Sequence, residues 1–310
     1  MLGVLCALAA LAAAGARADS LRARVVATPL AIPAALAGLS AVEPAGIALD
    51  AFGRLFISDA RQHRVMRFDS AGTWLGAEGT LGSEPGEFRR PGALALSGTL
   101  DLVVLDRENR RVVRYDHWGH LRSVRIDLAD PALEERIGRV DPADIATDRG
   151  GALALVDRDA DRVLIFDFSG NFLRALGGFG DLPGLYRGLS GVAFTPRGDL
   201  VTTERAGRRL QQIDPGGRSL ASWSLAVQAG RGALPVAVDE RQRIAVADES
   251  GGRLWLFDPS GRVLATCSGL RAPRALSFSP DGSLWVAGGD GASVLRIRFE
   301  SAIRDSAHAE

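Results

Sequence analysis

One segment of about 47 residues recurs along this chain five times, and a shortened sixth copy follows. Each regular copy carries an acidic residue and, five positions later, an arginine; the sixth copy has Gly288 and Ser293 in the same frame. The copies open at Pro44, Pro91, Pro142, Leu189, Pro235 and Pro273, and the pairs are Asp59/Arg64, Asp106/Arg111, Asp157/Arg162, Glu204/Arg209 and Asp248/Arg253. Repetition at this period is typical of solenoids and propellers.

The first copy divides into four short strands. Apolar runs over residues 46–49, 54–58, 64–68 and 73–77 predict strands, and the turns at 50–53 and 69–72 each begin with Asp and end with Gly, as type I turns prefer. The same turn chemistry returns at matching offsets in the other copies, except that the turn after the first strand departs from it in copies two (97–100) and five (239–242). Four strands joined by tight turns form an antiparallel meander, which is one propeller blade. The sequence therefore predicts an all-β, six-bladed β-propeller with four-stranded antiparallel blades.

The sixth copy supplies only three strands, over residues 275–278, 283–287 and 294–299. A closed ring with a short last blade exposes a sheet edge. Residues 21–28 lie outside all six copies and alternate as a strand does. We expect this N-terminal segment to pair as the missing outer strand and close the last blade.

The two ends of the chain have a composition of their own. Residues 1–18 form an apolar block that ends in Ala16-Arg17-Ala18, which fits the small-x-small rule for signal cleavage before Asp19. We expect export to a periplasm or the exterior, with a retained N-terminal membrane anchor as the alternative. The propeller is then expected over 19–300, with no membrane span after cleavage, and a disordered tail over 301–310.

Composition excludes several functions. The 37 basic residues balance 37 acidic ones, so the net charge offers no basic field for nucleic acid. All the basic residues are arginine, which excludes a Schiff-base lysine. Cys267 is the one cysteine beyond the leader; it lies in the apolar run VLATC, which predicts a small buried hydrophobe.

Three phrases of the repeat resemble a known family. GTLGSEPGEFRRPGALAL (79–96), ISDARQHRVMRFDSAG (57–72) and LVDRDADRVLIFDFSGNFL (155–173) are similar to NHL repeats. The resemblance covers residues 44–299 and implies a six-bladed propeller. Copies four and six depart most from the pattern, with Thr203-Glu204 and Gly288-Gly289 at the strand end. WD-type and kelch-type repeats fit less well, because Trp-Asp strand ends and a consistent Gly-Gly are missing.

Ligand binding is expected on the face that carries the loops between second and third strands, together with the inter-blade loops over 79–90, 127–141, 178–188 and 226–234. The acid and arginine of each copy have a structural explanation, because an Asp at a strand end accepts backbone N–H groups and pairs with an Arg. The residues between them vary and are better candidates for binding: Arg61, Gln62, His63, Arg107, Glu108, Asn109, Arg158, Asp159 and Arg205.

Metal sites have little support in the sequence. His117 and His120 are three positions apart across a tight turn, without the third protein ligand that a catalytic zinc needs. Gly-x-Ser-x-Gly, phosphate-loop and Rossmann motifs are absent. Calcium remains possible, since similar six-bladed lactonases of the gluconolactonase type hold it with a Glu, Asn and Asp cluster; here Asn109 is the asparagine that could face the channel rim.

The sequence thus favours an exported, non-catalytic module, without a cofactor, that binds a protein, peptide or glycan on its loop face. The alternative is a calcium-dependent hydrolase, lactonase or lyase with its site in the central channel. Convergent carboxylates with an amide and perturbed pKa values in the channel would favour the enzyme. Small apolar walls below an irregular charged rim would favour binding.

Overall fold

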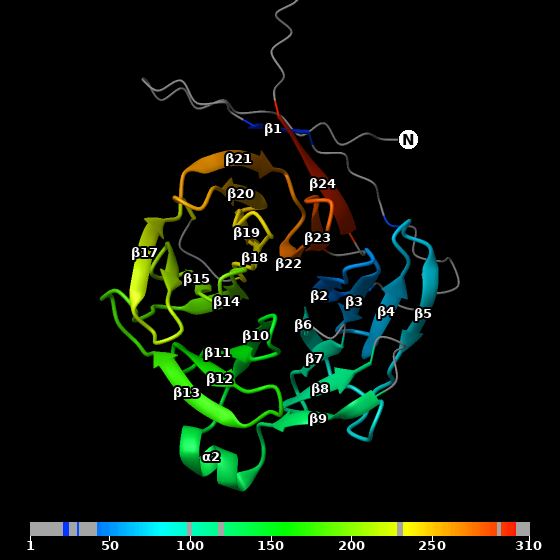
Figure 1. Ribbon diagram of the computed structural model, residues 1–310. Coiled ribbons are helices and arrows are strands. Elements are labelled where there is room, and N and C mark those ends of the chain that lie inside the picture. The colour runs from blue at the N-terminus through cyan, green and yellow to red at the C-terminus, as the bar shows by residue number, and fades with distance from the viewer. Residues whose placement is uncertain are drawn as a thin grey trace, which may run out of the picture.

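Six four-stranded antiparallel sheets surround a central axis in the computed structural model, which describes residues 21–24, 30, 42–97, 101–116, 121–227, 232–289 and 293–301 (Figure 1). The predicted fold class, a six-bladed β-propeller, is confirmed. In every blade the innermost strand opens one repeat copy, and in blades 1 to 5 the next three strands follow outward in sequence order.

The strands of blade 1 are β2 (Pro44–Leu49), β3 (Leu55–Asp59), β4 (Arg64–Phe68) and β5 (Trp74–Glu78). Blade 2 contains β6 (Pro91–Leu96), β7 (Leu102–Asp106), β8 (Arg111–Tyr115) and β9 (Leu121–Asp127). Blade 3 contains β10 (Pro142–Thr147), β11 (Leu153–Asp157), β12 (Arg162–Phe166) and β13 (Phe172–Gly177). Blade 4 contains β14 (Leu189–Phe194), β15 (Leu200–Glu204), β16 (Arg209–Ile213) and β17 (Ser219–Ser224). Blade 5 contains β18 (Val236–Val238), β19 (Ile244–Asp248), β20 (Arg253–Phe257) and β21 (Val263–Ser268).

Blade 6 closes the ring with strands from both ends of the chain. It contains β22 (Pro273–Phe278), β23 (Leu284–Gly288), β24 (Ser293–Ser301) and, outermost, β1 (Leu21–Arg24). The antiparallel register runs from Leu21 opposite Ser301 to Arg24 opposite Arg298. The predicted closure by an N-terminal strand is therefore confirmed, and within the predicted segment 21–28 the structure describes β1 over Leu21–Arg24 (Figure 1).

The core lies between neighbouring blades, because each sheet packs both of its faces against other sheets. The second strand of every blade is buried at all five positions, as in β11 and β19. Outer strands are more exposed, and β17 exposes every second side chain. Cys267 is buried among apolar side chains of blades 5 and 6, as its sequence context predicted.

Two inter-blade loops are held by a buried aromatic side chain. Phe88 and Tyr186 are fully buried, and each forms an isolated bridge with the start of its own loop. Gly79 precedes the first loop at φ 110°, and a Cβ there would lie 2.5 Å from the Phe88 ring. The glycine is needed both for the backbone conformation and for the space that the ring fills.

The connection from blade 2 to blade 3 differs from the expected loop. Residues 131–137 form a short helix, α2 (Pro131–Ile137), outside the ring of sheets (Figure 1). Asp130 caps it by accepting the backbone N–H groups of Ala132 and Leu133, and Pro131 occupies the first turn. Ile137 packs into the core between blades 2 and 3, so the helix covers that core without separating the sheets.

The expected leader over 1–18 lies outside the described residues, as does all of the expected tail except Ser301. Within the described part of the chain, no helix has the length and apolar character to cross a bilayer.

Candidate functional site: an arginine-rich channel mouth

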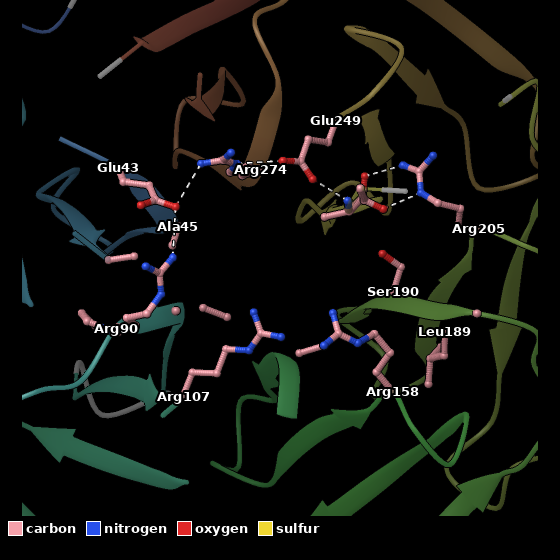
Figure 2. Close-up of a pocket in the computed structure, with 18 of the residues that line it drawn as sticks. Glu43, Ala45, Arg90, Arg107, Arg158, Leu189, Ser190, Arg205, Glu249 and Arg274 are labelled. Carbon is pink, nitrogen blue, oxygen red and sulfur yellow. Dashed lines mark hydrogen bonds and ion pairs between the residues drawn. The ribbon is translucent and has the colours of Figure 1, made fainter. Parts of the chain in front are cut away.

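The central channel opens on the face that carries the β3–β4 type of loop in each blade. A cavity of about 760 Å³ occupies this opening, which we call the channel mouth (Figure 2). Its walls are mostly small residues, among them Ala45, Ala93, Ala143, Gly188 and Ala233. Charged side chains form the rim: Glu43, Arg90, Arg107, Arg158, Arg205, Arg208, Glu249 and Arg274.

One position of the repeat supplies half of this rim. The residue that directly follows the strand-end acid reaches the channel mouth in blades 1 to 5. The occupants in order are Ala60, Arg107, Arg158, Arg205 and Glu249. Equivalent backbone positions thus carry different charges, and the mouth is positive over blades 2 to 4.

The strand-end acids hold the backbone around the mouth. Asp106 Oδ1 accepts the Arg89 N–H at 2.8 Å, and Asp157 Oδ1 accepts the Asp141 N–H at 3.1 Å. Asp59 and Glu204 make the same bond to Glu43 and Arg187. Each bond joins the end of a second strand to the segment that enters the first strand of the same blade.

The arginine five positions on binds the acid from the other side. Nε of Arg111 lies 2.8 Å from Asp106, that of Arg162 lies 2.8 Å from Asp157, and that of Arg209 lies 2.6 Å from Glu204. Arg64 pairs with Asp59 at 3.3 Å. Arg111 and Arg209 also donate to carbonyl groups of the preceding inter-blade loop, so these pairs fix the loops that surround the mouth.

Blade 5 departs from the repeat pairing. Asp248 forms its ion pair with Arg205 of blade 4, at 2.9 Å, and the described residues contain no ion pair between Asp248 and Arg253. Arg205 also donates to the carbonyl groups of Gly232 and Ala233. Burial opposes the ionised carboxyl, but hydrogen bonds from Arg205 and from the local turn hold the pKa of Asp248 below its usual value.

The rim over blades 1, 5 and 6 is neutralised internally. Arg274 bridges Glu249, at 2.7 Å, and Glu43, at 3.5 Å (Figure 2). Glu43 pairs with Arg90 as well, at 3.2 Å. These two carboxylates are therefore already engaged by guanidinium groups.

The rim over blades 2 and 3 has more cations than anions. Arg107 and Arg158 extend toward each other across the mouth (Figure 2). Both pair with Asp141, at 3.7 Å from Arg107 and at 2.9 Å from Nε of Arg158. Arg208 of blade 4 is exposed on the same rim, and the described residues provide it with no ion pair.

Of the nine binding candidates from the sequence, the structure brings Arg107, Arg158 and Arg205 together at the mouth. Arg61 and Glu108 lie farther out and pair with Glu43 and Arg90 at 3.8 and 3.5 Å. The other four candidates do not line the mouth: Gln62, His63, Asn109 and Asp159.

Two of these four are tied to neighbouring loops. His63 Nδ1 accepts the backbone N–H of Arg90 at 3.0 Å. Asn109 donates to the Gly82 carbonyl and to Asp106, so its amide is turned toward the inter-blade loop and away from the channel. The repeat analysis placed Arg90, Arg208 and Glu249 in loops of the expected binding face without singling them out, and it missed Glu43 and Arg274 as rim residues.

Deeper in the channel, a second cavity of about 390 Å³ extends to the opposite face between the six inner strands. Asp144 of β10 borders it and accepts backbone N–H groups from Ile145, at 2.9 Å, and from Val192, at 3.0 Å. Burial raises the pKa of Asp144 to about 7, and the two hydrogen bonds oppose that rise.

The described residues contain no group of three or more His, Cys, Asp or Glu side chains that could hold a metal ion. His117 and His120 lie outside the described residues. At the mouth itself, Glu43 and Glu249 are paired with arginine side chains, and these positive charges would repel a metal cation. The described residues of the channel do not fit a calcium ion, which requires six to eight oxygen ligands.

No family model matches the sequence. The Drosophila melanogaster protein brain tumor is 26% identical over 137 residues, a region that covers 44% of this chain and 12% of that protein.

Solved six-bladed propellers resemble the whole fold. A gluconolactonase from Xanthomonas campestris has a TM-score of 0.64 at 16% identity, covering 91% of each chain. The calcium-binding protein regucalcin from Agrobacterium tumefaciens has a TM-score of 0.61 at 15% identity, covering 93% of this chain and all of the other. Virginiamycin B lyase from Staphylococcus aureus has a TM-score of 0.59 at 14% identity, covering 86% and 87%. At these identities the similarity extends to the fold alone.

Proposed function

We propose that this protein is an exported, non-catalytic binding module that takes a protein, peptide or glycan ligand at the channel mouth. The observation that carries the proposal is the mouth itself, a cavity of about 760 Å³ with small walls and an irregular charged rim. Such a cavity is large enough for a ligand segment, and its rim residues stand on loops fixed by the strand-end acids. The phrases similar to NHL repeats and the partial match to protein brain tumor support an NHL-type repeat as part of this proposal.

The second candidate is a hydrolase or lyase with its site in the channel, and Asp144 is the observation that favours it. A carboxyl with a pKa of about 7 in a channel is suited to general acid or base catalysis. Similar folds in a gluconolactonase and a lyase add to this candidate. Binding is preferred because Asp144 belongs to no group of three or more His, Cys, Asp or Glu side chains among the described residues, and the rim acids Glu43 and Glu249 are paired with Arg274.

The binding proposal is tested with peptide and glycan arrays probed by the purified protein. Ala206 lies exposed on the rim, and Ala206→Trp is expected to plug the mouth and abolish binding of the array ligands. Ala51→Trp, in an exposed turn on the opposite face, is the matched control and is expected to bind as the wild type does. Array ligands that bind equally well to Ala206→Trp would refute a site at the mouth.

Calcium and EDTA in a thermal-shift assay separate the two candidates. A binding module without a calcium site is expected to melt at the same temperature in both. A rise of several degrees with calcium, reversed by EDTA, would favour the enzyme instead.

Export is proposed on the composition of residues 1–18. N-terminal sequencing of the protein from the periplasm or medium is expected to begin at Asp19. A cell-associated protein that retains residues 1–18 would support the membrane anchor.

A further inference from the structure

Arg107 and Arg158 occupy equivalent positions in blades 2 and 3, each directly after a strand-end acid. Their side chains are 43% and 48% exposed, and both guanidinium groups point into the mouth (Figure 2). The backbone beneath them is fixed, because Asp106 and Asp157 each accept a backbone N–H and an arginine N–H. The two cations are therefore presented on rigid supports.

A single carboxylate serves both cations. Asp141, which precedes β10, accepts a hydrogen bond from Nε of Arg158 at 2.9 Å, and its other carboxylate oxygen lies 3.7 Å from Nη2 of Arg107. The Arg107 contact is too long for a hydrogen bond, so this guanidinium keeps N–H groups for another acceptor. Asp141 is 28% exposed and stands behind the rim, outside the residues that line the cavity.

The remaining rim residues direct an anion to this side of the mouth. Glu43 and Glu249 lie on the opposite side and repel an anion, although Arg274 between them reduces that repulsion. Arg208 of blade 4 adds a further cation to the rim. The positive region thus spans blades 2 to 4, and the small residues Ala93 and Ala143 below it leave room for a side chain or chain end to enter.

We infer that Arg107 and Arg158 form a subsite for an anionic group, a carboxylate or a phosphate, carried by an acidic or phosphorylated peptide segment. This inference rests on the proposed binding function and specifies its ligand. The planar guanidinium fork matches both groups, and arginine clusters are a common means of reading acidic and phosphorylated motifs. The described residues that line the mouth include no aromatic side chain, so they lack the stacking platforms that single-stranded nucleic acids use. A peptide is therefore the favoured carrier of the anion.

Fluorescence anisotropy with three labelled peptides tests the subsite. The probes are a penta-glutamate peptide, a peptide of equal length with two phosphoserines among glutamines, and penta-glutamine. Wild-type protein is expected to bind the glutamate or the phosphoserine probe, and whichever binds more tightly identifies the source of the anion. Binding of neither charged probe, or of penta-glutamine equally well, would overturn the inference.

Three variants locate the binding. Arg107→Gln/Arg158→Gln is expected to lower the affinity for the charged probe at least about tenfold, since two charge-assisted contacts are lost. Arg197→Gln/Arg241→Gln removes two exposed arginines from turns on the opposite face and is expected to stay within about twofold of wild type, which controls for net charge. Equal weakening in both double variants would refute the subsite.

Asp141→Asn provides a change that a merely structural role would not produce. It removes the internal anion that competes for Arg107 and Arg158, so the charged probe is expected to bind about three- to tenfold more tightly. Unchanged or weaker binding by Asp141→Asn would contradict the assignment.

The array experiment separates the two proposals. If Ala206→Trp abolishes binding of the array ligands but Arg107→Gln/Arg158→Gln does not weaken it, the proposed binding function is supported and the anion subsite is refuted. The opposite result is that the charged probes bind less tightly to Arg107→Gln/Arg158→Gln, while the array ligands bind Ala206→Trp as well as they bind the wild type. This result would support the anion subsite and refute the proposed function.

Discussion

Replacing Arg205 by alanine is expected to lower the free energy of unfolding by about 3–5 kcal/mol, because the substitution leaves the Asp248 carboxylate buried without its cation. The two side chains are 9% and 3% exposed and lie 2.9 Å apart. Arg205 also donates to the Ala233 carbonyl at 2.7 Å and to Ser250 Oγ at 3.0 Å. Ser250 still donates to Asp248 after the substitution, which places the expected cost toward the lower end of this range.

Urea denaturation followed by tryptophan fluorescence measures the effect, with Arg253→Ala as the control. The repeat frame pairs Asp248 with Arg253, which is exposed, so Arg253→Ala is expected to cost less than about 1 kcal/mol. Adding Asp248→Asn to Arg205→Ala is expected to recover part of the loss, since it removes the unpaired charge.

The cost of Arg205→Ala also depends on pH. Contacts in the folded protein lower the pKa of Asp248, so the stabilisation from Arg205 is present above the unfolded pKa near 3.8 and disappears as the pH falls below it. The difference between wild type and Arg205→Ala is therefore expected to shrink from pH 7 to pH 3. A cost below about 1 kcal/mol at pH 7, or an equal cost for Arg253→Ala, would refute the cross-blade pairing.

Three further outcomes follow from the fold. Deleting residues 19–30 removes β1 and is expected to lower the melting temperature sharply; an unchanged temperature would contradict closure by β1. The pKa of Asp144 is about 7 in the folded protein and 3.8 in the unfolded chain, so ionisation of this carboxyl destabilises the fold increasingly as the pH rises between these values. The stability of Asp144→Asn relative to wild type is therefore expected to rise by up to ~4 kcal/mol from pH 4 to pH 8. A difference in stability that stays constant over this pH range would refute the raised pKa. In calorimetry, Gly46→Ala is expected to lower the stability of the protein by more than ~2 kcal/mol, because the new Cβ would lie 2.3 Å from the Gly92 carbonyl oxygen. Gly92→Ala is the control and is expected to lower the stability less, since a Cβ there would lie 3.7 Å from its nearest neighbour. Equal losses of stability in the two variants would refute the steric argument.

The blades were predictable because each one depends on local signals. Asp and Gly at fixed offsets define the turns, and in blades 1 to 4 the acid at the end of the second strand pairs with the arginine that opens the third. The helix α2 also left a local signal that was overlooked: Asp130 followed by Pro131, with the acidic Glu134 in the first turn, is typical of a helix start.

The rim was only partly predictable, because it combines two positions of the repeat. The residues after the strand-end acids, such as Arg107, were found because they vary between copies. Glu43, Arg90 and Arg274 come from the segments that enter the inner strands, next to the prolines that only marked where each repeat copy opens. The net charge of zero gave no indication that these charged residues cluster at the mouth, since a sum over the chain carries no information about position.

The partner of Asp248 depends on contacts between blades and not on spacing in the sequence. Arg205 is 43 residues away and belongs to the neighbouring sheet. Only the packing of blade 4 against blade 5 brings it closer to Asp248 than Arg253, which lies five positions from Asp248 in the chain.

The strand β1 has a consequence for synthesis of the chain on the ribosome. Its partner β24 ends at Ser301, so β1 stays without its neighbour until the ribosome has translated the chain through blade 6. At roughly 5–20 residues per second, this interval lasts on the order of 15–60 s. Throughout it the nascent chain carries an unpaired backbone edge, which makes a stalled or shortened product prone to aggregation and to proteolysis.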